Sequence, residues 1–228
     1  MGRRAGVGDP GRPRLNRDRV LRAALELADQ EGIAAVTMRE LGRRLGVEAM
    51  SLYNHVTTKD DVLDGIIDLV VAEIELPAGE VDWHEAMRQR AVWARDAFAR
   101  HPWAGALIDT RQTSGPGRLQ YLEWAIGTLR EAGFTIELAL FALSAIDSYI
   151  YGFLRQQQGM AAGQADTEES AEAFLDAIPA DRFPHVREIT GHVLRHGYDP
   201  TADFDFGLNL ILDSLERRLG AVRPDRGR

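Results

Sequence analysis

The chain has 228 residues, 45% hydrophobic and 27% charged, as in a soluble globular protein, and its lack of cysteine excludes disulfides, thiolate nucleophiles and cysteine-based zinc sites. Residues 1–59 carry 11 Lys and Arg against 7 Asp and Glu, whereas residues 60–228 carry 16 against 28, which together give the net charge of −8. A basic end on an acidic chain indicates contact with phosphate at that end only.

Residues 1–15 consist mainly of Gly, Pro and Arg with little to bury, and we expect a disordered basic arm there. Its arginines either reach a DNA backbone or minor groove beside a main contact or have no specific role. No apolar segment follows them as in a secretion signal, and no apolar run has the length of a membrane span. We therefore expect a cytoplasmic protein with no membrane contact.

The first predicted helix starts after Asn16, whose side chain can cap it, and ends at Gly32. Its apolar residues recur at helical spacing and form one stripe. The stripe consists of Val20, Leu21, Ala24, Leu25, Leu27 and Ala28. We expect it to cover the core of a small domain over residues 16–60.

Two short helices are predicted to follow within that domain. Thr37 and Glu40 form a capping box, in which each side chain would bond the other's backbone amide. Gly46 offers the positive φ that ends the first of the two helices, and the second is expected over Glu48–Val56. Two short helices joined by a glycine-containing turn indicate a helix-turn-helix whose second helix can enter a major groove.

The outer face of this second helix carries small, amide and aromatic side chains, because Leu52 and Val56 face inward. The residues expected to contact DNA are Thr37, Arg39, Ala49, Met50, Ser51, Tyr53, Asn54, His55 and Lys59. Phosphate contacts are assigned to Thr37, Arg39, Tyr53, His55 and Lys59, and base edges to Ala49, Met50, Ser51 and Asn54. Asn54 is the best candidate for an adenine contact. The alternative is a pair of short helices with no role on DNA.

The remaining chain is predicted to be helical throughout. Thr58 caps a fourth helix that should run to about Glu75 and contact both the small domain and the rest. Further helices are expected over Trp83–Arg100, Arg118–Ala132, Thr135–Gln158, Thr167–Ala177, Phe183–His196 and Thr201–Leu219, with loops over 76–82, 109–117 and 159–166. No alternating strand pattern is present, so the fold class is all-α, with a larger domain over residues 61–220 and a disordered tail over 221–228.

Two of these helices, Thr135–Gln158 and Thr201–Leu219, are rich in apolar residues. Paired with the same two helices of a second copy, they would form a four-helix bundle. A homodimer is favoured because one helix-turn-helix reads too few base pairs to be specific, and twofold symmetry doubles the site. The alternative is that both helices belong only to the core of one subunit.

Segments at both ends of the chain match one known family. The motifs LNRDRVLRAALELADQEG, VTMRELGRRLGV and SLYNHVTTKDDVLDGI, between Leu15 and about Val70, resemble the DNA-binding domain of the tetracycline-repressor (TetR) family. The segments Gly133–Gln158 and Phe204–Leu219 are similar to the tetracycline repressor's own subfamily, whereas Gly159–Pro200 matches weakly. The resemblance implies a dimeric, ligand-responsive repressor whose dimer interface is the predicted four-helix bundle.

The same resemblance implies an effector cavity in the larger domain. In the tetracycline repressor the drug is held by side chains at positions that match Glu75, Arg90, Ala94 and Ala125, and a magnesium-binding histidine matches Asp109. None of those drug-holding side chains is kept, which argues against tetracycline. The expected lining is Glu75, Arg90, Trp93, Ala94, Leu122, Ala125, Ile126, Leu143, Asp147 and Tyr151. This largely apolar set suits a small apolar or aromatic effector, unless Glu75 and Arg90 form an ion pair that closes an empty core.

Catalytic and cofactor motifs are not evident, and we expect neither an enzyme nor a cofactor. His192 and His196 have metal-ligand spacing, but a solvated helix face explains them better and no metal site is assigned. The sequence thus predicts a homodimeric repressor released from a palindromic operator by a small-molecule effector. A small-molecule-binding or enzymatic helical protein with a vestigial head domain is the alternative, and activation in place of repression stays open.

Overall fold

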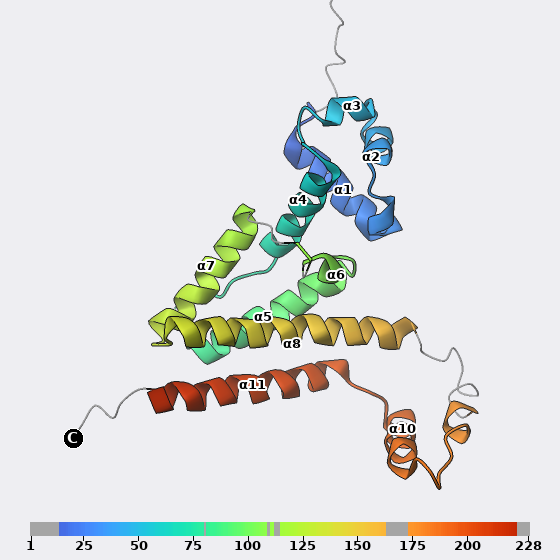
Figure 1. Ribbon diagram of the computed structural model, residues 1–228, viewed down its shortest axis with the longest axis vertical. Helices are drawn as coiled ribbons and strands as arrows, with labels where there is room; N and C mark the ends of the chain where they lie inside the picture. Colours follow the sequence, from blue (N-terminus) through green and yellow to red (C-terminus); the bar gives the residue numbers. More distant parts are fainter. Residues whose placement is uncertain (1–13, 80, 109, 112–114, 163–172, 223–228) are drawn as a thin grey trace, which may run out of the picture.

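The computed structural model describes residues 14–79, 81–108, 110–111, 115–162 and 173–222. Within these ranges every regular element is a helix, so the predicted all-α fold is confirmed. Figure 1 shows a small head at one end, two long helices at the opposite end, and shorter helices between them.

The head consists of α1 (Arg17–Glu31), a short 3-10 turn (Ile33–Ala35), α2 (Met38–Leu45) and α3 (Ala49–Leu52). Asn16 caps α1 as predicted, because its Oδ1 accepts from the backbone amide of Arg19 at 2.8 Å. Gly46 ends α2 with φ 63° and ψ 42°, the left-handed conformation that the sequence required of it. The apolar core under these helices consists of Val20, Leu21, Ala24, Leu27, Ala28, Val36, Leu41, Leu45, Leu52 and Val56.

Helix α4 (Lys59–Ala72) leads from the head into the body and is buried on more than one side. It begins at the predicted cap, since Thr58 Oγ1 accepts from the amide of Asp61 at 3.0 Å. It ends at Ala72, before the predicted end near Glu75. The amide of Ile74 donates to the carbonyl of Val71 at 3.1 Å, which forms a turn tighter than an α-helix. Pro77 also disfavours the helical conformation in the residue before it.

The body contains α5 (Trp83–Arg100), α6 (Ala104–Ile108), α7 (Pro116–Glu131), α8 (Ile136–Ala162), α10 (Pro184–His196) and α11 (Pro200–Val222). Helix α7 starts inside the predicted loop 109–117 because Pro116 occupies its first turn, where proline is tolerated. Helix α8 has the predicted Thr135 cap and continues beyond Gln158 into the connection predicted to be flexible. Helices α8 and α11 lie side by side and antiparallel (Figure 1).

Several expectations concern residues outside the described ranges. These include nearly all of the basic arm 1–15, most of the predicted tail 221–228, Asp109, and most of the predicted helix Thr167–Ala177. At the C-terminal end, α11 extends through Val222.

Helix α8 corrects the expectation that no segment has the length of a membrane span. Its stretch Ile136–Met160 is long and apolar enough by length and composition, with one third of it buried inside the protein. A core helix of a soluble protein passes the same test. In this fold α8 packs against α5, α7 and α11, and its exposed side carries Ile136, Leu140 and Phe141.

Gly42 in α2 generates a first prediction. A Cβ at this position would lie 2.9 Å from the carbonyl oxygen of Val47 and 3.1 Å from the amide nitrogen of Ala49, which are both backbone atoms. Gly42→Ala should therefore lower the free energy of unfolding by about 1–3 kcal/mol in urea titrations. The control is Gly127→Ala in α7, where a Cβ meets open space and should stabilise by roughly 0.5–1 kcal/mol. Equal effects from both variants would contradict the close approach of the two helices.

Candidate nucleic-acid interface and effector site

The capping box at the start of α2 is only half formed. Thr37 Oγ1 accepts from the amide of Glu40 at 3.2 Å, as predicted. The Glu40 carboxylate, however, accepts from the Arg43 guanidinium, with Nε at 2.9 Å. A charge-assisted contact through two oxygens one turn along the helix is stronger than a single bond to a backbone amide. The prediction that Glu40 reaches back is therefore wrong.

Helix α3 is shorter than the predicted helix Glu48–Val56. After Leu52 the backbone forms tighter turns. The amide of Tyr53 donates to the carbonyl of Met50 at 3.3 Å, and the amide of His55 donates to the carbonyl of Leu52 at 2.9 Å. These contacts span three residues, as in a 3-10 turn, and end α3 at Leu52. Leu52 and Val56 are nevertheless buried as predicted, at 0% and 2% exposure, so the orientation of the outer face is kept.

The residues predicted to contact DNA lie together at the head. Thr37, Arg39, Met50, Tyr53, Asn54 and Lys59 are exposed, and Ala49, Ser51 and His55 are half-buried. Figure 1 shows α2, α3 and the first turn of α4 at the end of the molecule opposite α8 and α11. Met50 is 76% exposed and Tyr53 46%, so both side chains are available for contact with another molecule.

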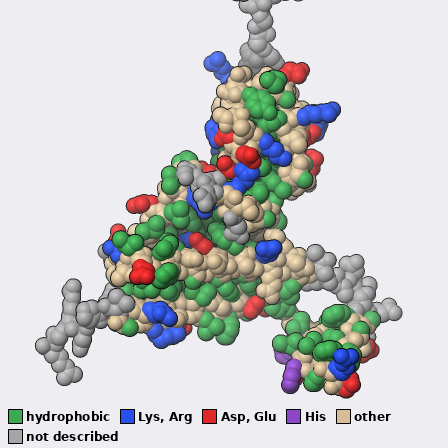
Figure 2. Space-filling model, viewed as in Figure 1, with side chains coloured by type: hydrophobic (Ala, Val, Ile, Leu, Met, Phe, Trp, Pro, Cys, Tyr) green, Lys and Arg blue, Asp and Glu red, His purple; other side chains and the backbone are tan. Residues whose placement is uncertain are grey.

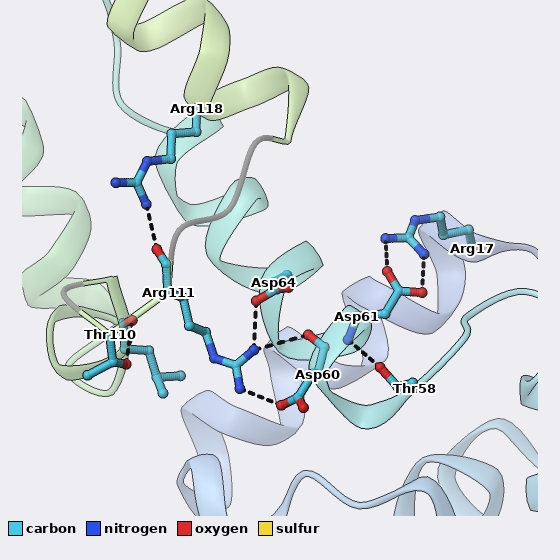
Figure 3. Close-up of polar contacts among 9 residues, drawn as sticks. Arg17, Thr58, Asp60, Asp61, Asp64, Thr110, Arg111 and Arg118 are labelled. Carbon is cyan, nitrogen blue, oxygen red and sulfur yellow. Dashed lines mark hydrogen bonds and ion pairs between the residues drawn. The ribbon is translucent and has the colours of Figure 1, made fainter.

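An ion pair fixes the start of α4 to α1. The Arg17 guanidinium donates to both carboxylate oxygens of Asp61, at 2.6 and 2.9 Å (Figure 3). Asp61 also accepts from the amide of Thr57 at 2.7 Å. The bond from Arg17 and, to a smaller extent, the amide of Thr57 lower the pKa of Asp61 to about 2, although burial opposes them. Residues far apart in the sequence thereby set the angle at which α4 leaves the head.

The body holds the same helix through a second set of contacts. Arg111 donates to Asp60 at 2.6 Å and to Asp64 at 2.7 Å, as Figure 3 shows. One turn further, the Asp68 carboxylate accepts from the amides of Gly117 and Arg118 at 3.1 and 2.8 Å and thereby caps α7. The sequence analysis did not predict these contacts between α4 and the body. The four-residue spacing of the three aspartates on one helix face was the available signal.

A third set of contacts surrounds His101, which is 7% exposed. Its Nδ1 lies 2.7 Å from Asp29 of α1, and its Nε2 lies 3.1 Å from Glu73 just after α4. Trp103 Nε1 donates to the same Asp29 oxygen at 2.7 Å. This cluster ties the head, the end of α4 and the α5–α6 corner together.

The predicted effector residues divide by depth in the structure. Arg90, Ala94, Ala125 and Leu143 are buried; Trp93, Leu122, Asp147 and Tyr151 are half-buried; Glu75 and Ile126 are exposed. Glu75 lies at the surface because α4 has already ended, and Ile126 is 42% exposed on α7. Neither residue is therefore placed in the interior beside Arg90.

The alternative expectation of an ion pair between Glu75 and Arg90 is wrong. Arg90 is 0% exposed and its Nη2 donates to Asp147 Oδ1 of α8 at 2.5 Å. The Cζ of Arg90 lies 4.6 Å from the centre of the Tyr121 ring, a cation–π contact from α7. Sequence reasoning did not include Tyr121, which lies one helical turn before the predicted Ala125 and so on the same face.

The described residues of the body border at least two openings. An opening of about 340 Å³ borders Asp147 and Tyr151 on α8. A larger groove of about 830 Å³ is lined by residues 77, 79 and 81–83 together with parts of α5, α7 and the end of α11, and it contains none of the predicted effector residues. The smaller opening borders Asp147, the partner of the buried Arg90.

The described residues include no group of three or more His, Asp or Glu side chains that could hold a metal ion. His192 and His196 lie with ring centres 4.6 Å apart on α10, where both are exposed. A structural zinc site needs four ligands, and the pair supplies two.

A helix-turn-helix head joined by one helix to a larger helical body defines a DNA-binding transcriptional regulator. A family model described as "Bacterial regulatory proteins, tetR family" matches residues 20–66, and one described as "Tetracyclin repressor-like, C-terminal domain" matches residues 76–219. The chain belongs to the TetR family of transcriptional regulators.

Known relatives agree with this assignment. An "HTH-type transcriptional regulator" of Saccharopolyspora erythraea is 33% identical over 92% of this chain and 88% of its own length. The "HTH-type transcriptional repressor DrrR1" of Streptomyces coeruleorubidus is 32% identical over 94% of this chain and 82% of its own. Among solved structures, ActR of Streptomyces coelicolor in complex with actinorhodin matches with a TM-score of 0.78 and 27% identity, covering 91% of this chain and all of that one.

The pair Arg17–Asp61 generates a second prediction. A carboxylate whose folded pKa is depressed contributes stability above its unfolded pKa, near 4, and loses it as pH falls through the folded value of about 2. Arg17 is about half exposed, so solvent screening limits the effect, and Arg17→Gln should lower the free energy of unfolding at pH 7 by about 1 kcal/mol. Urea titrations at pH 7 and pH 2 measure it. A difference from wild type that persists undiminished at pH 2 would contradict this origin.

Proposed function

We propose that the protein is a homodimeric repressor that binds a palindromic operator and is released by a small apolar or aromatic effector. The observation that carries the proposal is α4, whose first residues lie in the head while its acidic face is held by the body through Arg111 and the start of α7. A rearrangement of the body around an effector would move α4, and with it the head.

Exposed apolar side chains support the dimer. On α8 and α11 they are Ile136, Leu140, Phe141, Phe206 and Leu210, each more than half exposed. Figure 2 shows hydrophobic side chains along α11 and on the α10 arm. Helix α10 has no buried residue and exposes Val186 and Ile189, an arrangement that leaves its apolar face to be covered by another chain. A second copy on α8 and α11 gives the four-helix bundle of the proposed dimer.

On DNA, each α3 of the dimer would occupy one of two successive major grooves. Thr37, Arg39, Tyr53, His55 and Lys59 would contact phosphates, and Ala49, Met50, Ser51 and Asn54 would contact base edges. Lys59 is suited to phosphate because it is exposed in the first turn of α4, where helix amides also face outward.

The effector would act by changing the distance between the two heads. Binding beside α5 and α8 would shift the α6–α7 segment that grips α4, so that the two half-sites are no longer engaged together and affinity falls. ActR is described in complex with actinorhodin, and the proposed effector of this chain is likewise a small organic molecule. The relatives are named regulators and repressors, so we propose a cytoplasmic regulator without enzymatic activity or cofactor.

A third prediction tests DNA binding and the two classes of contact. Lys59→Ala should weaken binding to specific and scrambled duplexes alike and reduce the slope of log affinity against log salt by about 1. Asn54→Ala should instead weaken specific binding by about 1–3 kcal/mol and relax the preference at one base pair. Both are measured by fluorescence anisotropy on DNA from the protein's own upstream region, across a salt series. If the protein ignores that DNA, or both variants behave identically on cognate and scrambled duplexes, the assignment fails.

A fourth prediction tests the dimer. Leu140→Arg combined with Leu210→Arg places two charges on the exposed faces of α8 and α11, where burial of an unpaired charge is costly. The variant should sediment as a monomer and lose specific operator binding. Leu119→Arg is the control, because Leu119 is 54% exposed on α7 and should leave the dimer intact. A dimeric double variant, or a monomeric wild type at micromolar concentration, would exclude this interface.

A further inference from the structure

The guanidinium of Arg90 is buried without enough partners. Its Nη2 group donates to Asp147, while Nε and Nη1 find no hydrogen-bond partner among the described residues. Nearly all buried polar groups in folded proteins are hydrogen-bonded, and a guanidinium has five N–H groups to satisfy. The free donors of Arg90 therefore lack an acceptor within the described part of the chain.

The surroundings of Arg90 consist of aromatic side chains and the Asp147 carboxylate. The ring of Tyr121 faces the guanidinium, and Tyr151 packs edge-on against Phe98 with ring centres 5.4 Å apart. Burial raises the pKa of both tyrosine hydroxyls, and the nearby Asp147 carboxylate adds to this, so both hydroxyls stay protonated. Flat ring faces and one positive charge are the features that a planar anion would meet here.

Asp147 separates this charge from solvent. Its side chain is 23% exposed, and it lines the opening of about 340 Å³ together with Ser144, Ser148, Tyr151, Gly152 and Arg155. Ligand sites of small molecules begin at about this volume. Arg155 is exposed at the rim and adds a second positive charge. A molecule in the opening would therefore meet Asp147 first and Arg90 behind it.

We propose that the effector carries an anionic oxygen group, a carboxylate or an ionised enol, on an aromatic framework, and that this group binds the free donors of Arg90 and displaces Asp147 from Nη2. The proposal rests on the proposed function, because it names the chemical class of the effector of the same site. Exchange of one carboxylate for another keeps the buried charge compensated. A purely apolar effector would leave Nε and Nη1 unpaired.

The larger groove does not suit such a ligand. Its lining includes the carboxylates of Asp82, Glu123, Glu131 and Glu216. Four carboxylates repel an anion, whereas the smaller opening offers Arg155 at its rim and Arg90 behind Asp147. The same exchange would break the tie between α5 and α8 that Arg90 and Asp147 make, which links effector binding to the arrangement of the body.

The test uses a matched pair of probes on the full-length protein, 2-naphthoate and its neutral methyl ester. Titration calorimetry and the shift in melting temperature should show wild type binding the acid roughly tenfold or more tightly than the ester, the size expected of charge-assisted hydrogen bonds. Arg90→Met should abolish this preference and leave ester binding unchanged. Arg88→Met is the control, because Arg88 pairs with Glu85 on the same helix, and it should retain the preference.

Asp147→Asn tests the proposal if Arg90→Met does not fold. It removes the competing charge at nearly constant volume, and it should strengthen binding of the acid several-fold while leaving the ester unchanged. Equal binding of acid and ester by wild type, including no binding of either, overturns the proposal. So does a preference that survives Arg90→Met, or an Asp147→Asn variant that binds the acid no better, either of which makes Arg90–Asp147 a structural ion pair.

Operator binding, measured on the same samples, separates this proposal from the proposed function. A protein that binds its operator but shows no Arg90-dependent preference for the acid contradicts the effector class alone. A protein that prefers the acid through Arg90 but ignores DNA contradicts the repressor assignment and leaves the anion site in place.

Discussion

The arrangement of the whole molecule depends on how the carboxylates of α4 are held. Asp61 is bound by Arg17 of the head, whereas Asp60 and Asp64 are bound by Arg111 and Asp68 caps α7. One short helix thus carries ion pairs to both parts of the protein. A shift of Arg111 or of the start of α7 acts on α4 directly, because both contact its aspartates.

The ion pairs that hold α4 are weak enough for a ligand to change its position. Exposed ion pairs each contribute about 0.2–1 kcal/mol, so the few that hold α4 together contribute a few kcal/mol at most. Coupling energies between distant sites in regulators are typically about 1–3 kcal/mol, which is the same range. An effector therefore needs only a modest difference in affinity to change the position of the heads. The buried Arg90 differs, because an incompletely paired charge in the interior costs several kcal/mol, and the proposed anionic ligand would offset that cost.

Local sequence patterns predicted the elements well where one side chain decides the outcome within its own turn. Asn16, Thr58 and Thr135 cap their helices as expected, and Gly46 adopts the left-handed conformation. The predictions failed where two local partners competed. Glu40 had both a backbone amide and Arg43 within reach, and the sequence does not show which contact is stronger in the folded geometry.

The sequence by itself determined the all-α class, the helix-turn-helix, its inward residues Leu52 and Val56, and the membership of the TetR family, because these follow from spacing within a few residues and from motifs. Only the tertiary structure decided the partner of Arg90, the ion pairs of Arg111 with α4 and the cluster around His101. These contacts join residues from 28 to 74 positions apart. Which side chains meet over such separations depends on how the helices pack, and a charged group pairs with the opposite charge that packing brings nearest.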